Sequence, residues 1–306
     1  MRLATFAPTA DAAPRIGALL DDDQVLEVRA AAIHHGQGTT PFPHTLLELL
    51  SDAPSLRAAR ATIEAAQHAS ADLRVAGLIH RAADVVWLPP IPRPGKIVCL
   101  GRNYREHAAE MGAEVLPYPV LFAKFSNTLL GHQQPLQLPA ASDKVDYEAE
   151  LMLVIGRTAK DVPPEHALEY VAGYTVFNDV SVRDWQRRTN EWLQGKSFDH
   201  TGPCGPVIVT ADAISDPHNL DVTLRLNGTV MQQGNTSQFI FDIPAMLAYI
   251  TTIMTLEPGD LIATGTPSGV GASRNPPVFL QAGDLVEITI AEVGTLITPV
   301  VAAQGT

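Results

Sequence analysis

Two glutamates separated by one residue have a spacing suited to metal chemistry. Glu148 and Glu150 precede the unbroken apolar run of residues 151–155, which Gly156 ends. This run predicts a strand, on which side chains two residues apart share a face and lie roughly 7 Å apart along the chain. Two buried like charges are unfavourable unless a cation lies between them, and a divalent cation with oxygen ligands meets that need. Alternatively, both acids face solvent on an edge strand, as acids usually do.

A third carboxylate and a histidine–glutamate pair add to these candidates. Asp179 lies at the end of another apolar segment, residues 173–180, which also predicts a strand. His107 and Glu110 are three residues apart in a segment of helical composition, so on a helix they share a face. A carboxylate beside an imidazole raises its basicity and fixes its tautomer, as a general base requires. Pairs at this spacing also occur by chance on helices that have no chemical role.

Three further polar segments offer contacts for an anion. Lys196 lies in a glycine-containing loop, where it is either a surface lysine or a group that neutralises an anion. Residues 181–192 have a polar, helical composition that includes Arg183 and Gln186, and either a solvated face or an anionic substrate site explains them. The loop of residues 264–271 is rich in Gly, Thr and Ser, whose amides and hydroxyls can hold a carboxylate. It lacks the lysine and spacing of a P-loop, which argues against nucleotide binding.

Strands and helices must position these candidates. The 22 glycines and 24 prolines are typical of a β-rich fold with many turns. The clearest hairpin joins residues 221–226 and 228–232 through Asn227 and Gly228, a dipeptide typical of tight turns. Further strands are predicted over residues 96–100, 120–124, 146–155, 207–210 and 285–291, and helices over residues 104–112, 165–171 and 242–254.

Residues 1–90 are predicted to form a small α+β domain, and residues 91–306 a catalytic domain. A proline-stiffened connector, residues 87–94, separates the two. Thr45 and Ser55 are candidate N-caps for helices in the first part. The strands expected there cover residues 2–6, 15–20 and 24–28, and the helices cover residues 45–50 and 55–67.

Composition limits the partners of the chain. Its net charge of −12 at pH 7 argues against nucleic acid or an anionic membrane surface. Cys99 and Cys204 give no disulfide framework and no zinc spacing, so buried thiols are expected. The chain has neither an apolar run of 18 residues nor a signal-like N-terminus. We therefore expect a cytoplasmic protein with no membrane partner.

These motifs, taken in order, resemble the fumarylacetoacetate hydrolase family over roughly residues 92–300. The first 90 residues resemble the variable N-terminal extension that many members carry. The matching motifs are residues 101–107 (GRNYREH), 146–150 (DYEAE), 177–179 (FND), 195–199 (GKSFD), 256–260 (LEPGD) and 264–269 (TGTPSG).

The resemblance implies a fold and a metal site. The fold is α+β and β-rich: a catalytic domain built as a mixed β-sheet roll or sandwich, with a small N-terminal α+β domain. Members are usually homodimers. A Mg²⁺ or Mn²⁺ ion is implied at Glu148, Glu150 and Asp179.

The resemblance also assigns roles around that metal. A short lid carries the catalytic dyad, here His107 and Glu110. The lysine of the GKSFD motif, here Lys196, is catalytic as well. Substrate-binding positions fall on Arg183, Gln186 and Thr266.

The first functional hypothesis is a divalent-metal-dependent hydrolase that cleaves the C–C bond of an acylpyruvate or 2,4-diketo acid through a metal-bound enolate. His107, oriented by Glu110, would deprotonate the attacking water, and Lys196 would stabilise the developing charge. One alternative is an isomerase or decarboxylase of an unsaturated 2-oxo or 2-hydroxy dicarboxylate from aromatic catabolism, or an oxaloacetate decarboxylase. An alternative of another class is a non-catalytic binding protein on the same fold. The expected partner is a small 2-oxo acid.

Overall fold

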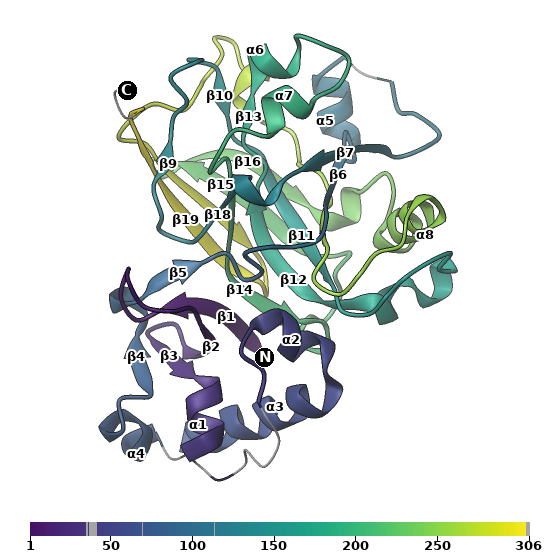
Figure 1. Cartoon of the computed structure of the whole chain (residues 1–306). Coiled ribbons are helices and arrows are strands. Elements are labelled where there is room, and N and C mark those ends of the chain that lie inside the picture. The colour runs from purple at the N-terminus through teal and green to yellow at the C-terminus, as the bar shows by residue number, and fades with distance from the viewer. Residues whose placement is uncertain (35, 37–41, 69, 113, 304–306) are drawn as a thin grey trace.

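The computed structural model describes residues 1–34, 36, 42–68, 70–112 and 114–303. Across these residues, twelve strands form one large sheet (Figure 1). They follow the order β4 (Ile79–Arg81), β3 (Gln24–Glu27), β2 (Arg15–Asp21), β1 (Arg2–Ala7), β14 (Gly202–Thr210), β12 (Val171–Asn178), β11 (Ala149–Ile155), β17 (Leu261–Ala263), β6 (Ile97–Gly101) and β7 (Val120–Lys124), with β5 (Val86–Leu88) beside β1 and β8 (Leu129–Leu130) beside β14. The sheet is mixed, because β6 runs parallel to β17 and β8 parallel to β14, whereas its other pairs are antiparallel.

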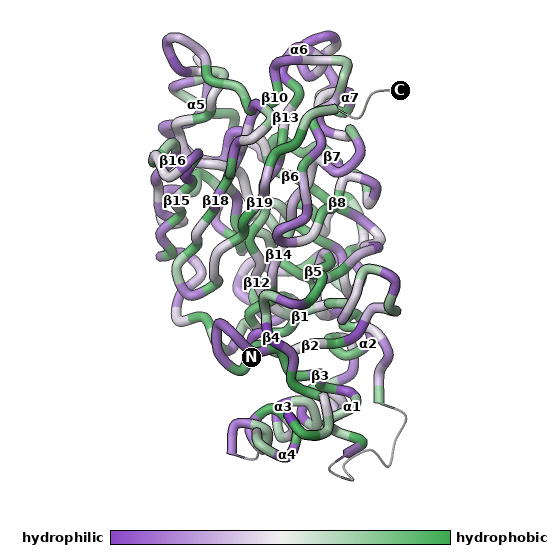
Figure 2. The backbone as a smooth tube through the Cα atoms, turned by 90° about the vertical axis from the view of Figure 1, so that its left-hand side faces the viewer, coloured by the Kyte–Doolittle hydropathy of each residue, from purple (hydrophilic) through white to green (hydrophobic). Residues whose placement is uncertain are grey.

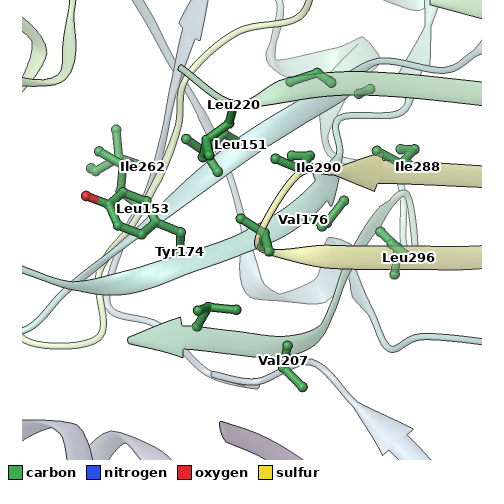
Figure 3. Close-up of a cluster of buried hydrophobic side chains, with 14 of the residues drawn as sticks. Leu151, Leu153, Tyr174, Val176, Val207, Leu220, Ile262, Ile288, Ile290 and Leu296 are labelled. Atoms are coloured by element: carbon green, nitrogen blue, oxygen red, sulfur yellow. The ribbon is translucent and has the colours of Figure 1, made fainter. Parts of the chain in front are cut away.

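A second sheet packs against the middle of the first. It follows the order β16 (Thr229–Asn235), β15 (Asp221–Leu226), β18 (Leu285–Ile290), β19 (Gly294–Val301) and β9 (Leu136–Gln137), and β10 (Val145–Asp146) pairs separately with β13 (Ser181–Val182). Figure 3 shows Leu151 and Val176 of the first sheet beside Ile290 and Leu296 of the second, and all four are fully buried. This layered, mixed-sheet arrangement confirms the predicted α+β, β-rich fold class.

The helices are α1 (Val28–His34), α2 (Leu46–Ser51), α3 (Ala53–His68), α4 (Ser70–Val75), α5 (Arg105–Glu110), α6 (Arg183–Gln186), α7 (Leu193–Lys196) and α8 (Ile243–Ile253). Helices α1 to α4 lie at one end of the sheets and α5 to α7 at the other, whereas α8 lies beside the central strands (Figure 1). Single turns of 3₁₀ helix occur at Ala82–Asp84, Ser126–Thr128, Ala211–Ala213, Thr236–Gln238 and Gly271–Ser273, and a longer one at Pro164–Tyr170. No helix in the described ranges is long and apolar enough to cross a membrane.

The N-terminal strands continue the large sheet. Leu3 of β1 pairs with Ile208 of β14, so backbone hydrogen bonds join the first part of the chain to the second. Helices α1 to α4 lie at this end of the molecule, far from α5, α6 and α7 (Figure 1). In Figure 2 the tube is apolar along many strands and hydrophilic around α6. The division near residue 90 stays a prediction.

Several local predictions are confirmed because they depend on nearby residues. Thr45 caps α2 in a capping box with Glu48. Asp242 caps α8, whose bounds fall within the expected residues 242–254. Asn227 and Gly228 have φ values of 51° and 78°, as the predicted tight hairpin turn between β15 and β16 requires. Both cysteines are buried as expected.

Other predictions are wrong, for physical reasons. Residues 146–155 form two strands, since Asp146 accepts the amide of Tyr147 and the chain then changes its partner from β13 to β12. Residues 181–192 give only the short β13 and α6, after which the chain turns. The helix expected over residues 165–171 is present, but as a 3₁₀ helix at Pro164–Tyr170. Ser55 is no cap, because its amide donates to Asp52 ahead of α3. Strand β19 and helix α1 were not predicted.

Candidate functional site

A cavity of about 390 Å³ is lined by residues of α5, α6 and α7. These three helices lie at one end of the central strands (Figure 1). Seven of the nine predicted site residues line it: His107, Glu148, Glu150, Arg183, Gln186, Lys196 and Thr266. Asp179 and Glu110 contact this lining from behind it. The structure therefore brings together side chains that are up to 159 positions apart in the sequence.

The register of two central strands creates the acidic cluster. Ala149 of β11 pairs with Asn178 of β12, so Glu148 and Glu150 lie beside Asp179, which follows β12 directly. Carboxylate oxygens of the three acids lie within 4.8 Å of one another. All three side chains are buried, and β11 has neighbours on both sides. The alternative that the glutamates face solvent on an edge strand is therefore wrong.

Three buried cations surround two of these acids. The Lys196 ammonium nitrogen lies 2.8 Å from Glu148 Oε2 and 2.6 Å from Asp179 Oδ2. Arg183 Nη2 lies 2.7 Å from Glu148 Oε1, and Lys124 Nζ lies 3.1 Å from Asp179 Oδ1. Burial alone would raise the pKa of Glu148, but Lys196 and Arg183 outweigh it and lower that pKa to about 2.

Glu150 is placed differently. It accepts the amide of Gly265 at 2.8 Å, and no ion pair reaches it from any residue that the structure describes. Burial, followed by repulsion from Asp179 and Glu148, raises the pKa of Glu150 well above its usual value. One carboxylate of the cluster thus lacks a compensating positive charge.

The acidic cluster fits a divalent cation. With Asp146, which Arg183 also contacts, four buried carboxylates face three cationic side chains, so one negative charge is left over. Within the described chain, Asp179 Oδ1 has no hydrogen-bond donor, although the Lys124 charge is close to it. Buried oxygens in such a set are ligands that Mg²⁺ or Mn²⁺ prefers. The residues that could hold the ion are Glu148, Glu150 and Asp179.

The predicted dyad is assembled on α5. His107 Nδ1 lies 3.2 Å from Glu110 Oε2, and the imidazole is buried and faces the cavity. Burial acts to raise the pKa of Glu110, but hydrogen bonds from His107, Ser273 and Gly269 lower it on balance. A proton on Nδ1 leaves Nε2 free to accept one, so this geometry suits a general base.

A loop after β17 completes the cavity. Thr266 lines it, and Thr266 Oγ1 accepts a hydrogen bond from Gln232 Nε2 at 2.8 Å. Gln232 Oε1 in turn accepts the amide of Ala149 at 2.9 Å, which fixes the loop to the start of β11. Gly265 has a φ of 96°, a conformation that glycine adopts without strain.

Cationic and aromatic side chains stand at the mouth of the cavity. Arg102 and Arg187 line the cavity, are exposed, and make no ion pair among the residues described. The Arg102 guanidinium lies 5.4 Å from the centre of the Trp192 ring. A Cβ on Gly101 would lie 2.3 Å from that ring, so glycine is needed there. These arginines offer a charge for the outer end of an anionic ligand.

Sequence reasoning missed Lys124, Asp146, Gln232 and the mouth arginine Arg102. Lys124 is the last residue of an otherwise apolar strand, and this position of a charged side chain could have marked it as a candidate site residue. Asp146 lies within a recognised motif, yet its role depends on the distant Arg183. No local signal marks Gln232.

Comparison with known proteins places this site in context. The family model described as fumarylacetoacetate (FAA) hydrolase C-terminal matches residues 96–301. The protein named oxaloacetate tautomerase fahd2, mitochondrial, from Xenopus laevis is 40% identical over 305 residues, which cover 98% of this chain and 90% of that protein. Its name places it in mitochondria, so the cytoplasmic location expected for this chain gains no support from it.

Two solved structures are similar over nearly their whole length. The 2-hydroxyhepta-2,4-diene-1,7-dioate isomerase from Mycobacterium marinum has a TM-score of 0.72 and 34% identity, with all of both chains covered. The maleylpyruvate hydrolase from Sphingobium sp. SYK-6, in complex with manganese(II) and pyruvate, has a TM-score of 0.76 and 34% identity, with 99% of this chain and 100% of that chain covered. Their printed activities belong to different reaction classes.

Proposed function

Because the chain belongs to the fumarylacetoacetate hydrolase family, we propose that it is a divalent-metal-dependent enzyme that interconverts the keto and enol forms of a 2-oxo dicarboxylate such as oxaloacetate. The observation that carries this proposal is the arrangement of one cavity, in which a buried, oriented imidazole faces an acidic cluster. The similarity to a named oxaloacetate tautomerase over almost the full chain supports the choice of reaction.

Each side chain has a defined task in this reaction. A cation held by Glu148, Glu150 and Asp179 would withdraw electron density from the 2-oxo group and favour the enolate. His107 Nε2 removes a proton from C3, while Glu110 holds the imidazole through Nδ1. Lys196 keeps a positive charge beside the acidic cluster, where negative charge develops on the substrate oxygen. Return of the proton to oxygen or to C3 gives the enol or the keto form.

Charge favours a dicarboxylate as the substrate. The buried groups carry one net negative charge, which a divalent cation converts to one net positive charge. Arg102 and Arg187 add two positive charges at the mouth. A dianion therefore meets the cation at its 2-oxo end and the arginines at its outer carboxylate. A monocarboxylate gains less from the same cavity.

C–C hydrolysis is the second candidate, although the sequence placed it first. The same His107–Glu110 pair is suited to deprotonating a water molecule, and the similarity to a maleylpyruvate hydrolase favours this reaction. Tautomerisation needs only proton transfer, for which no water site is required. Decarboxylation forms an enolate when CO₂ leaves the keto acid, and isomerisation forms one by proton removal, so a product assay must separate these reactions from tautomerisation. The assembled dyad and lysine argue against a non-catalytic binding protein.

The test uses purified protein with Mg²⁺ or Mn²⁺ and three readouts. Tautomerisation is followed by the decay of enol-oxaloacetate absorbance, decarboxylation by pyruvate formation from oxaloacetate, and hydrolysis by pyruvate formation from acylpyruvates. We expect acceleration of the enol decay, and its loss on chelation and in a His107→Gln variant. Pyruvate formation from acylpyruvates without any effect on the enol decay would replace the proposal by the second candidate.

A further inference from the structure

The loop that follows Thr266 contacts the catalytic dyad directly. The Ser273 hydroxyl donates to Glu110 Oε1 at 2.6 Å. The Gly269 amide lies 3.0 Å from Oε1 and 3.2 Å from Oε2 of the same carboxylate. Since His107 contacts Oε2, three donors converge on Glu110, and two of them come from one loop. Neither Ser273 nor Gly269 is among the predicted site residues.

We propose that Ser273 is a positioning residue, which together with the Gly269 amide forms a seat for the Glu110 carboxylate and thereby aims His107 into the cavity. This inference rests on the proposed function, because it gives the dyad its working geometry. Ser273 acts through Glu110 and has no contact with the reacting atoms. The seat holds α5 in the position seen here, over the acidic cluster.

Helix α5 needs such a contact because little else fixes its far end. It has six residues, and Tyr104 at its start provides no side-chain cap. A helix this short has no stability of its own. Its beginning is anchored, since Tyr104 is buried and its ring contacts Phe239 at 5.1 Å between centroids. Its end is followed by Gly112, with a φ of 63°. Glu110 is therefore the side chain that secures this end.

The loop that forms the seat is itself held firmly. Asp146 accepts the amides of Gly271 at 2.7 Å and Ala272 at 3.0 Å. A Cβ on Gly271 would lie 1.8 Å from the Val278 carbonyl oxygen, so the backbone is closely packed there. Asp146 also accepts Arg183 Nε at 2.7 Å. The seat is thus tied to the same buried charges that surround the acidic cluster.

The Ser273 hydroxyl has one proton and two nearby acceptors. Its oxygen lies 2.8 Å from the Val270 carbonyl oxygen as well as 2.6 Å from Glu110. An ionised carboxylate is the stronger acceptor, and the pKa of Glu110 is lowered, so the proton points to Glu110. Removing this charge-assisted bond leaves the carboxylate with the Gly269 amide as its only partner from the loop.

The same loop provides a matched control. Ser268 donates to Glu106 at 3.3 Å. Glu106 lies on the same helix as Glu110, but among the described residues the His107 imidazole pairs with the Glu110 carboxylate and not with that of Glu106. Ser268→Ala therefore removes a loop–helix hydrogen bond without affecting the dyad. Ser273→Thr keeps the hydroxyl and serves as the conservative rescue.

The experiment compares Ser273→Ala, Ser273→Thr and Ser268→Ala by amide hydrogen exchange and by steady-state kinetics with oxaloacetate. In Ser273→Ala we expect exchange over residues 105–112 to accelerate about tenfold or more, and kcat to fall roughly ten- to hundredfold with KM changed less than about threefold. Ser273→Thr should restore most of kcat, and Ser268→Ala should change it less than about threefold. Far-ultraviolet circular dichroism verifies that each variant is folded.

The outcomes separate the seat from the proposed function. Faster exchange over α5 in Ser273→Ala supports the seat even if no variant acts on oxaloacetate, in which case only the proposed reaction fails. Unchanged exchange overturns the seat, whatever happens to kcat. An equal loss of kcat in Ser268→Ala also overturns it, because the effect would then be a general loosening of the loop.

Discussion

Glu150→Gln is expected to stabilise the metal-free protein and to remove most of its affinity for a divalent cation. Glu150 is buried with no ion-pair partner in the described structure, and burial raises its pKa. Because the pKa of Glu150 is higher in the folded than in the unfolded state, the protonated side chain favours folding. This contribution to stability is fully present below about pH 4.5, the unfolded value, and is lost as the pH rises through the folded pKa. Glutamine has nearly the same shape as glutamate but cannot ionise, so the variant does not lose stability as the pH rises. It should therefore melt at a higher temperature than the wild type at neutral pH.

Glu148→Gln should have the opposite effect on stability. The pKa of Glu148 is lowered to about 2 by Lys196 and Arg183, against a usual value of 4.5. That difference corresponds to about 3 kcal/mol of stability, present above pH 4.5 and lost as the pH falls through about 2. Removing one partner of a buried pair commonly costs about 3–5 kcal/mol, in agreement with this value. This variant should melt several degrees lower than the wild type.

Both variants should bind metal poorly. A unit charge pair 4 Å apart at an effective dielectric of 20 is worth about 4 kcal/mol, and a divalent ion at ligand distance gains more than this from each carboxylate. Loss of one ligand charge therefore predicts a fall in affinity of at least about a thousandfold. Opposite changes in stability with a shared loss of metal binding are the signature of the proposed cluster.

The assay combines thermal melting in a chelator with isothermal titration of Mn²⁺ and Mg²⁺. Melting is repeated across the pH range from 4 to 8, because the stabilisation by Glu150→Gln should grow as the pH rises. If Glu150→Gln is destabilised as much as Glu148→Gln, the inference that Glu150 lacks a compensating positive charge is wrong. If either variant retains wild-type metal affinity, these acids do not hold the ion.

Three further predictions concern the groups around the cluster. His107→Gln should lower kcat about 10²- to 10⁴-fold with metal affinity unchanged in titration, and an equal loss of metal binding would contradict its role as a base. Lys124→Met, which leaves Asp179 without its second cation, should destabilise the protein by about 3–5 kcal/mol in denaturant unfolding, whereas a neutral result would contradict a paired buried lysine. Arg102→Ala and Arg187→Ala should each raise KM about three- to tenfold for dicarboxylates but hardly for monocarboxylate 2-oxo acids, and an equal effect on both classes would contradict binding of the outer carboxylate.

Features of the site that depend on local sequence were predictable. The spacing of Glu148 and Glu150 gives a shared direction on any extended segment, and the spacing of His107 and Glu110 gives contact on any helix. The hairpin at Asn227 follows from the backbone conformation that its turn requires. These interpretations needed no knowledge of distant contacts, and the structure has these residues in the expected local geometry.

Features that depend on tertiary contacts were not predictable. Lys124 reaches Asp179 across 55 positions, and Asp146 binds the amides of a loop 125 positions later. These contacts also bear on the single strand that was predicted over residues 146–155. The structure divides it after Asp146, whose carboxylate accepts backbone amides of the distant loop. The expected helix is only the short α6, whose Arg183 and Gln186 side chains are buried and line the cavity. No pattern within a short window encodes these pairings.

The division of the site between strands and a short helix explains how one fold supports several reactions. Glu148, Glu150 and Asp179 lie at the ends of paired strands, whose hydrogen bonds fix their positions. Tautomerisation, decarboxylation and hydrolysis all proceed through an enolate, so this rigid part favours each of them equally. Under the proposed function they differ in where the proton or the water is delivered, which His107 on α5 would determine. A helix held at one end by Tyr104 and at the other by Glu110 can change its residues without disturbing the strands. Reaction type should therefore follow the residues of α5 and its seat more closely than those of the acidic cluster.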